Sequence, residues 1–294
     1  MRILITGKNG QVARCLADLA NRHPNLELFF AARSEADVFL DLSDNQSIRS
    51  AVEKIQPNIV ISAAAYTAVD QAEDEPDIAM QCNGVAPGIL ANEAAKHDAK
   101  IIHISTDYVF DGEHLDAYLP SHAVNPINVY GKTKLSGEIA VRNENPNHTI
   151  LRTAWGYSPY GKNFLKTMLH LAEKNSELRV VDDQIGTPTS AYEVANGILR
   201  LCDLWFSGSQ AGLNETHHLV GDEAMSWYGF AKKIFTASAA AGGVSCDVRP
   251  ISTDEFPMKA SRPQNSRLDR TSFLQLLEVS NLNPHDEDPL IPCL

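Results

Sequence analysis

The sequence has little that would build disulfides or a membrane anchor. Its 294 residues include five cysteines, an odd number without any C-x-x-C spacing. We therefore expect free thiols and a cytoplasmic location. No apolar run approaches the length of a membrane span, and the first ten residues do not follow the pattern of a signal peptide. The cysteines are Cys15, Cys82, Cys202, Cys246 and Cys293.

Basic charge and metal-binding patterns are also scarce. The net charge of −12 at pH 7 argues against nucleic acid as a partner. It leaves room for a small anionic ligand, which local basic groups can hold. The adjacent His217 and His218 lack the spacing of a metal site, so we expect no metal there.

Short apolar runs alternate with helix-like segments in the first half of the chain. This alternation predicts an α/β fold built on a Rossmann-type, doubly wound parallel sheet. The second half is less regular. We expect a larger domain over 1–155 and a smaller, mixed α/β domain over 156–294, with a soft boundary, interleaved segments and an irregular tail from residue 280. The predicted strands are 2–6, 26–31, 58–64, 100–105 and 148–153, and the predicted helices are 10–21, 44–56, 76–97, 129–143, 162–174, 191–206 and 225–241.

A glycine-rich turn, GKNGQVA, follows the first predicted strand and opens a helix. Gly7 permits a tight turn, Gly10 lets the backbone approach a pyrophosphate, and Ala13 is small enough for the helix to pack on the sheet. The N-terminus of the helix then favours an anion. An ordinary strand–turn–helix is the alternative, but the position of the motif favours a dinucleotide site.

The residues after the second predicted strand bear on the choice of cofactor. A guanidinium at Arg33 suits the 2′-phosphate of NADPH, which we favour, while Glu35 and Asp37 lie close enough to serve NADH. Asp41 and Leu42 follow and are expected near the adenine. The small residues Ala63, Ala64 and Ala65 end the third strand, where ligands bind in such sheets.

The stretch NVYGKTKL contains a tyrosine and a lysine four residues apart. It is not a P-loop, because Pro126 stands where that motif needs a glycine. If the stretch is helical, Tyr130 and Lys134 share a face, and the ammonium should lower the pKa of the phenol. Tyr228 and Lys232 repeat the spacing without a hydroxyl-ended strand before them, so we expect that pair to be packing and surface.

A hydroxyl group is also expected beside Tyr130 and Lys134. The strand KIIHIS runs into Thr106 and Asp107, and in a parallel sheet the carboxyl end of a strand faces the ligand crevice. Thr106, Tyr130 and Lys134 are therefore predicted to converge on one reacting carbonyl.

Several blocks of the sequence, in order, resemble the extended short-chain dehydrogenase/reductases, and within them the dTDP-4-dehydrorhamnose reductase family. The resemblance covers about residues 1–268, and several blocks are typical of that reductase group rather than of the whole superfamily. The blocks read GKNGQV, AAAYTAVDQAE, STDYVFDG, NVYGKTKLSGE, RTAWGY, NFLKTML, DDQIGTPT and SRPQNSRL.

The resemblance implies a reaction and a set of roles. NAD(P)H would reduce the C4 ketone of dTDP-4-dehydro-L-rhamnose to dTDP-L-rhamnose, for cell-surface polysaccharide. Tyr130 would protonate the alkoxide, Lys134 would hold the nicotinamide ribose, and Thr106 would hydrogen-bond the carbonyl. The cofactor would be lined by Gly10, Gln11, Val12, Asp41, Leu42, Ala65, Tyr66 and Thr67.

The resemblance also implies contacts with the sugar nucleotide. Asp107 and Trp155 would face the sugar, and Asn163 and Arg262 are further candidates. Trp155 read alone fits a core aromatic equally well, and Arg262 read alone fits a surface ion pair better.

The sequence leaves three points open: a bridging metal, the oligomeric state and the choice between the main function and its rivals. Some relatives hold magnesium at a dimer interface through glutamates, but Cys15 stands at one such position and Glu193 is out of register at another. We therefore expect a monomer or a homodimer without a bridging metal. Two rival functions are an NADP-binding regulatory subunit, like the β subunit of methionine adenosyltransferase, and a sugar-nucleotide epimerase or dehydratase.

Overall fold

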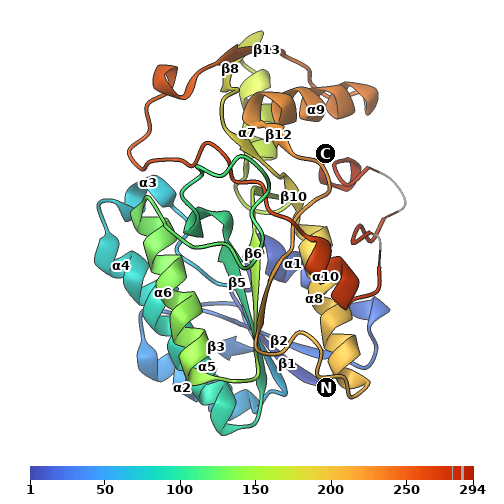
Figure 1. Cartoon of the computed structure of the whole chain (residues 1–294). Helices are drawn as coiled ribbons and strands as arrows, with labels where there is room; N and C mark the ends of the chain where they lie inside the picture. The colour runs from blue at the N-terminus through green and yellow to red at the C-terminus, as the bar shows by residue number, and fades with distance from the viewer. Residues whose placement is uncertain (280, 286–287) are drawn as a thin grey trace.

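A seven-stranded parallel sheet forms the centre of the protein (Figure 1). The computed structural model describes residues 1–279, 281–285 and 288–294. The strand order is β11-β6-β5-β4-β1-β2-β3, so the chain winds outward from β1 in both directions, as the sequence predicts. The strands are β1 (Arg2–Thr6), β2 (Glu27–Ala32), β3 (Val38–Phe39), β4 (Ile59–Ser62), β5 (Lys100–Thr106), β6 (His148–Thr153) and β11 (Glu215–His218).

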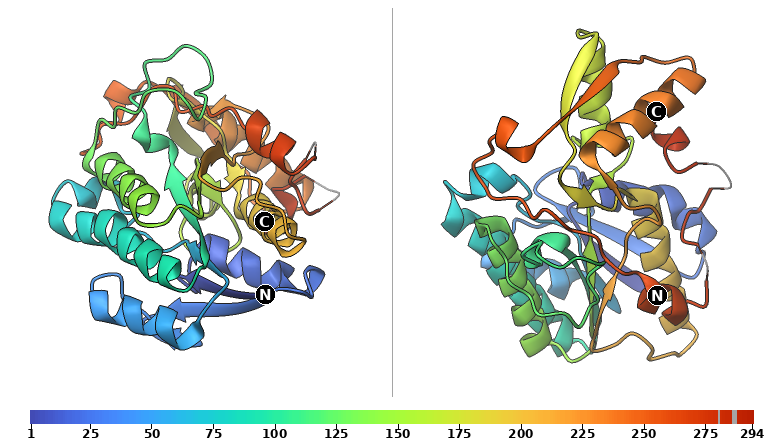
Figure 2. Two further views of the ribbon diagram at one scale, coloured as in Figure 1. Left: turned by 60° about the horizontal axis from the view of Figure 1, so that its bottom comes forward. Right: turned by 45° about the horizontal axis from the view of Figure 1, so that its top comes forward.

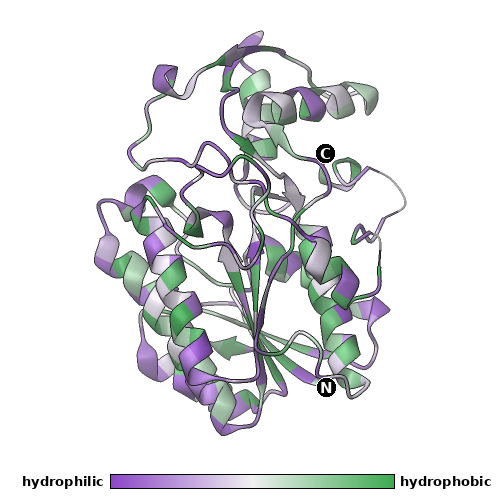
Figure 3. Cartoon of the chain, in the orientation of Figure 1, coloured by the Kyte–Doolittle hydropathy of each residue, from purple (hydrophilic) through white to green (hydrophobic). Residues whose placement is uncertain are grey.

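Helices cover both faces of this sheet (Figures 1 and 2). Alternate residues of β1 point to opposite faces: Ile3 and Ile5 pack with α1 and α8, whereas Leu4 packs with α2 and α5. Strands covered on both sides are apolar on both sides, which Figure 3 shows as green strands between the helices. These helices are α1 (Gln11–Leu19), α2 (Asn45–Ile55), α5 (Ala86–Lys96), α6 (Val129–Glu144) and α8 (Ala191–Phe206).

The helix predicted over 76–97 has three parts. A π-helical turn, η2 (Gln81–Val85), lies between α4 (Pro76–Met80) and α5. The short α3 (Val69–Ala72) precedes them. A π turn adds one residue to the helical path and turns side chains that a regular helix would place elsewhere.

A second, smaller cluster lies beyond the carboxyl edge of the sheet (Figure 1). There Leu165 of α7 packs with Val180 of β8 and with Phe230 and Ile234 of α9. Its elements are α7 (Phe164–Ala172), α9 (Trp227–Ala240) and the parallel pair β8 (Glu177–Val181) and β13 (Asp247–Ile251), with the short pairs β7 (Gly156–Tyr157) and β10 (Thr189–Ser190), and β9 (Ile185–Gly186) and β12 (Met225–Ser226).

The chain passes residue 155 and then returns to the large sheet, where α8 packs on α1 and β11 pairs with β6. The domain boundary itself stays a prediction. Among the described residues after 279, the only regular element is a 3-10 turn, in keeping with the predicted irregular tail; residues 280, 286 and 287 lie outside the described ranges. The remaining elements are α10 (Thr271–Leu276), η1 (Ala20–Arg22), η3 (Asp107–Val109), η4 (Thr253–Glu255) and η5 (Ile291–Cys293).

Sequence analysis missed β3, β8, β11, β13 and the two-residue strands. β11 reads ETHH and has no aliphatic residue, while β13 contains Pro250, which argues against a strand unless it lies at an edge. Both strands do lie at edges. Within the described part of the chain, no helix combines the length and apolar character that crossing a membrane requires.

Two glycines let α6 pack closely on η3 and on the π turn. A Cβ atom added at Gly131 would lie 2.2 Å from the carbonyl oxygen of Tyr108, and one added at Gly137 would lie 2.1 Å from that of Asn83. No side chain fits at these distances. Gly131 therefore serves packing, in agreement with the rejection of a P-loop.

We expect Gly137→Ala to lower the free energy of unfolding by about 1–3 kcal/mol, because the added methyl must displace the π turn. Gly156→Ala is the control, since no atom lies within 4 Å of its added Cβ. Chemical denaturation measures both variants. Equal stability of the two would show that α6 is free to shift.

Candidate active site

The crevice at the carboxyl edge of the sheet is fixed by hydrogen bonds between neighbouring strand ends. Thr6, the last residue of β1, accepts hydrogen bonds at Oγ1 from the N–H groups of Ala63 and Ala64, each at 3.0 Å. The loop after β4 is thus held beside the end of β1. This is the point where the strand order reverses, at which open parallel sheets bind ligands.

The glycine-rich turn leaves the N-terminus of α1 uncapped. Gly7 has φ 82°, and an added Cβ would lie 3.0 Å from that of Ala64. Gly10 is the N-cap residue and supplies no side-chain acceptor, whereas α2, α6, α7, α8 and α9 each begin with a capping side chain. The free N–H groups of the first turn therefore suit an anion such as a diphosphate. Ala13 is buried against the sheet, as predicted.

The predicted contacts Gln11 and Asn163 bind each other. Oε1 of Gln11 accepts hydrogen bonds from Oγ of Ser158 at 2.7 Å and from Nδ2 of Asn163 at 2.9 Å. Asn163 also caps α7 through its Oδ1. Its amide therefore joins the glycine-rich turn to the smaller cluster, and its predicted contact with the sugar nucleotide gains no support from this arrangement. Val12, the next residue after Gln11, is partly buried.

The residues predicted around the adenosine lie at the ends of β2 and β3. Arg33 is exposed directly after β2. Oδ1 of Asp41 accepts hydrogen bonds from the backbone N–H and the hydroxyl of Ser43, and these lower the pKa of Asp41, with a smaller contribution from the charge of Arg33. The carbonyl of Leu42 accepts a hydrogen bond from Gln81 of the π turn. Arg33 is thus a surface cation close enough to act on a neighbouring carboxylate.

Asn83 orients the loop that follows β4, a role that sequence analysis missed. Its side-chain amide accepts a hydrogen bond from the N–H of Tyr66 at 2.8 Å and donates one to the carbonyl of Tyr66 at 3.0 Å. It also donates to Oγ1 of Thr133 on α6. Asn83 points inward from the π turn, which no periodicity in the sequence indicated. The loop leaves Ala63 and Ala65 partly buried and Thr67 exposed.

Thr106 and Asp107 are buried together at the end of β5. Oγ1 of Thr106 donates a hydrogen bond to Oδ1 of Asp107 at 2.9 Å. The other oxygen, Oδ2, is buried and has no hydrogen-bond partner among the described residues. Burial raises the pKa of Asp107 to about 6. A buried carboxylate oxygen without a partner fits a donor supplied by a ligand, such as a sugar hydroxyl.

Tyr130 lies beside these groups. Its ring meets that of Tyr108 edge to face, with centroids 5.5 Å apart. Burial raises the pKa of the Tyr130 phenol to about 12; the charge of Asp107 adds to this, and a hydrogen bond with Thr106 opposes it. The predicted lowering of this pKa by Lys134 is therefore wrong for this structure. The phenol instead stays protonated near neutral pH.

The orientation of Lys134 explains why its ammonium does not lower the pKa of Tyr130. Its Nζ donates a hydrogen bond to the carbonyl of Ile104 at 2.7 Å and lies 3.5 Å from Nε2 of His103, so two of its contacts are with β5. The side chain is only 2% exposed. Burial lowers the pKa of Lys134 to about 8, and the charge of Glu138 opposes that effect.

Trp155 and Arg262 each have a partner within the chain. Trp155 has φ 47° and stacks on Trp227 of α9, with ring centroids 3.5 Å apart and an interplanar angle of 4°. Nη2 of Arg262 forms an ion pair with Asp70 at 2.7 Å. The structure thus shows aromatic packing for Trp155 and an ion pair for Arg262, which are the alternatives to contacts with the sugar nucleotide. The guanidinium of Arg262 still lies 5.9 Å from the ring of Tyr108, which contacts Tyr130.

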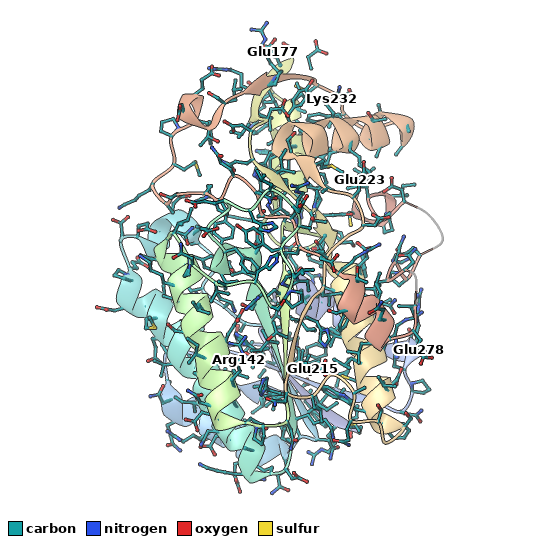
Figure 4. All side chains as sticks on the ribbon, in the orientation of Figure 1. Arg142, Glu177, Glu215, Glu223, Lys232 and Glu278 are labelled. Atoms are coloured by element: carbon teal, nitrogen blue, oxygen red, sulfur yellow. The ribbon has the colours of Figure 1, made fainter. Side chains whose placement is uncertain are left out.

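The second tyrosine–lysine pair lies elsewhere. Lys232, labelled in Figure 4, is exposed on α9 in the smaller cluster, with its Nζ 5.3 Å from the ring centroid of Tyr228. Tyr228 is partly buried in that cluster, which confirms the reading as packing and surface. Across the described ranges, no cluster of three or more His, Cys, Asp or Glu side chains is arranged to hold a metal ion.

The strand order, with a glycine-rich turn after β1, defines a Rossmann-type protein of the dinucleotide-binding class. Within that class, the chain belongs to the RmlD substrate binding domain family, which it matches over residues 1–284. It is 44% identical over 268 residues to the dTDP-4-dehydrorhamnose reductase of Sinorhizobium fredii, covering 91% of this chain and 88% of that relative. The family resemblance of the sequence blocks is confirmed.

Solved structures agree with this assignment. The crystal structure of a dTDP-4-dehydrorhamnose reductase from Clostridium acetobutylicum has a TM-score of 0.85 and 37% identity, covering 100% of this chain and 97% of that one. The Bacillus anthracis reductase, solved in complex with NADP, has a TM-score of 0.84 and 35% identity, covering 95% and 94% of the two chains.

The buried ammonium of Lys134 should destabilise the folded chain at neutral pH. Between pH 8 and 10.5 the unfolded chain binds more protons than the folded one, so stability rises with pH in that window. Lys134→Met removes the effect. We expect this variant to be more stable than the wild type by about 1–3 kcal/mol at pH 7, with the difference shrinking towards pH 10. Denaturation at both pH values measures it.

Lys132→Met is the matched control for that experiment, because Lys132 is exposed on the same helix. It should leave the pH dependence unchanged. A Lys134→Met variant that is less stable than the wild type at pH 7 would contradict the assignment of a costly buried charge.

Proposed function

We propose that this chain reduces the C4 ketone of dTDP-4-dehydro-L-rhamnose to dTDP-L-rhamnose with NADPH, and that Tyr130 is the proton donor. The observation that carries the proposal is the grouping of Thr106, Tyr130 and Lys134 at the carboxyl edge of the sheet. Relatives named as dTDP-4-dehydrorhamnose reductases align over nearly the whole chain and support this substrate. The NADP in the Bacillus anthracis relative supports the cofactor.

The roles of the side chains follow from their environments. Bound NADPH supplies the hydride that reaches the carbonyl carbon. The phenol of Tyr130, kept protonated by burial, gives its proton to the carbonyl oxygen. The hydroxyl of Thr106, which donates to Oδ1 of Asp107 in this structure, turns to donate its hydrogen bond to the same oxygen and stabilises the charge that develops there. The free oxygen of Asp107 accepts a hydrogen bond from the sugar.

The chain also offers groups that fit the cofactor. The uncapped N-terminus of α1 takes the diphosphate, and exposed Arg33 takes the 2′-phosphate. Lys134 has two contacts with β5, which leaves one of its three donors for the nicotinamide ribose. NADH stays possible through Glu35 or Asp37.

The two rival functions draw less support. A regulatory subunit would not need a buried, protonated phenol beside Thr106, and the relatives from Sinorhizobium fredii and Aggregatibacter actinomycetemcomitans, which cover most of the chain, are named as reductases. Similarity to a dTDP-glucose 4,6-dehydratase, at 16% identity, shows the fold alone. A monomer or a homodimer without a bridging metal, and a cytoplasmic location, stay predictions.

We expect the purified chain to oxidise NADPH when dTDP-4-dehydro-L-rhamnose is added. Tyr130→Phe should slow turnover about 100-fold or more, because it removes the proton donor, while NADPH affinity stays nearly unchanged. Loss of absorbance from the reduced nicotinamide measures turnover, and fluorescence of bound NADPH measures affinity.

Tyr228→Phe is the control for Tyr130→Phe, since that phenol belongs to the second pair with the same spacing, outside the crevice. It should turn over at the wild-type rate. If the wild type does not consume NADPH, the proposed reaction is rejected. If Tyr130→Phe is unaffected, the proton comes from another group.

Replacing Arg33 with alanine should weaken NADPH binding about tenfold or more and leave NADH binding nearly unchanged. The guanidinium contributes a charge-assisted contact that only the 2′-phosphate can make. Titration with each cofactor measures both constants. Arg249→Ala removes another exposed arginine, from β13, and should change neither. Equal losses for the two cofactors in Arg33→Ala would show that Arg33 does not select NADPH.

A further inference from the structure

A buried carboxylate lies one helical turn behind Lys134. Glu138 is 0% exposed, and its two oxygens accept four hydrogen bonds. Oε1 accepts hydrogen bonds from Oγ of Ser105 at 2.6 Å and from Nε of Arg152 at 2.9 Å. Oε2 accepts hydrogen bonds from Nη2 of Arg152 at 2.8 Å and from Nη2 of Arg142 at 2.9 Å. Burying a charge in this way is costly unless every lone pair finds a partner. None of the roles assigned above uses Glu138.

These hydrogen bonds join the elements that carry the reacting groups. Ser105 immediately precedes Thr106 on β5, and Arg152 is the partner of Ser105 in the register of β5 and β6. Glu138 shares α6 with Tyr130 and Lys134, four residues after the lysine. A single carboxylate thus fixes the helix that carries the phenol to the strand that carries the hydroxyl. The outer partner, Arg142, is labelled on α6 in Figure 4.

The same carboxylate faces an excess of buried positive charge. Lys134 and Arg152 are 2% and 3% exposed. The other titratable groups around them are Tyr130 and Arg142 on α6, His103 on β5, Asp107 after β5 and His218 on β11. Burial and neighbouring cations lower the pKa values of both histidines, so neither adds charge at neutral pH. Asp107 lies against Thr106 and Tyr130, whereas Glu138 pairs directly with Arg152 and follows Lys134 by one turn on the same face of α6.

We propose that Glu138 is a positioning residue of the reductase site, which fixes α6 against β5 and β6 and supplies the counter-charge for the Lys134 ammonium. The inference rests on the proposed function, because it concerns the lysine assigned to the cofactor ribose. It adds to Thr106, Tyr130 and Lys134 a buried residue that acts on the site through the position of α6 and the charge of Lys134.

Glu138 should affect the pH at which Lys134 loses its proton, which a purely structural residue would not do. Glu138 raises the pKa of Lys134, against the effect of burial. Without the carboxylate, the lysine should lose its proton at lower pH. Cofactor affinity and kcat/KM, both of which depend on the ammonium, should then begin to fall at lower pH.

The test is Glu138→Gln, which keeps the shape of the side chain and removes its charge. NADPH affinity is measured by fluorescence between pH 6 and 9.5, without sugar nucleotide, and kcat/KM is measured over the same range. In the wild type the affinity should fall above a pKa of about 8. In Glu138→Gln we expect this midpoint to move down by about one pH unit, and kcat at pH 7 to fall more than KM rises.

Glu93→Gln is the matched control. Glu93 is also a buried carboxylate with two cationic partners, Arg49 and Lys96, but it lies on α5 and contacts neither β5 nor Lys134. It should lose less stability, because Arg49 and Lys96 are 44% and 56% exposed, and it should keep the wild-type pH midpoint. An equal shift in both variants, or an unchanged midpoint in Glu138→Gln, overturns the proposal.

A second variant keeps the test valid if Glu138→Gln does not fold. Glu138→Gln combined with Arg152→Met removes the uncompensated guanidinium, and apolar replacement of buried ion pairs is often tolerated. Because loss of the Arg152 charge itself raises the pKa of Lys134, the reference for the double variant is Arg152→Met alone. The midpoint should be lower in the double variant than in Arg152→Met, and equal midpoints in the two would overturn the proposal. The NADPH titrations do not depend on the sugar. If the wild type shows no reductase activity but Glu138→Gln still lowers the midpoint of NADPH binding, the proposed function is rejected and the role of Glu138 is supported.

Discussion

The close packing of α6 on the turn that follows β5 and on the π turn is the constraint on which the rest of the structure depends. Gly131 and Gly137 allow it, because a Cβ atom at these positions would collide with the backbone carbonyls of Tyr108 and Asn83, respectively. The helix then presents Tyr130 beside Thr106 and inserts Lys134 under the end of the strand. The proposed reduction uses this juxtaposition, so the two glycines bear on the chemistry as well as on packing.

The crevice is assembled from groups that are costly to bury. Lys134 and Glu138 are charged side chains removed from water, and one oxygen of Asp107 has no hydrogen-bond partner in the part of the chain that the structure describes. Such groups lower stability and are retained where they perform a task. The pKa shifts of Tyr130 and Lys134 agree with the proposed reaction: the phenol keeps its proton, and the lysine remains mostly charged near neutral pH.

The sequence predicted the part of the fold that depends on periodicity. Apolar strands alternating with helices gave the central sheet, and the boundaries of α8 were predicted to the residue. Polar or proline-containing edge strands such as β11 and β13 lacked that signal. In the site, motif spacing brought Thr106, Tyr130 and Lys134 together. It did not indicate the direction of the lysine, the inward turn of Asn83 or the stacking of Trp155 on Trp227, because these depend on tertiary contacts.

A crystal structure with NADP and dTDP-L-rhamnose bound would test the central claim most directly. The account predicts that the sugar oxygen at C4 lies within about 3 Å of both the phenol of Tyr130 and the hydroxyl of Thr106. It also predicts that the nicotinamide ribose lies against Lys134. A sugar whose C4 oxygen contacts neither hydroxyl, or a nicotinamide outside the crevice beside β5, would contradict the account.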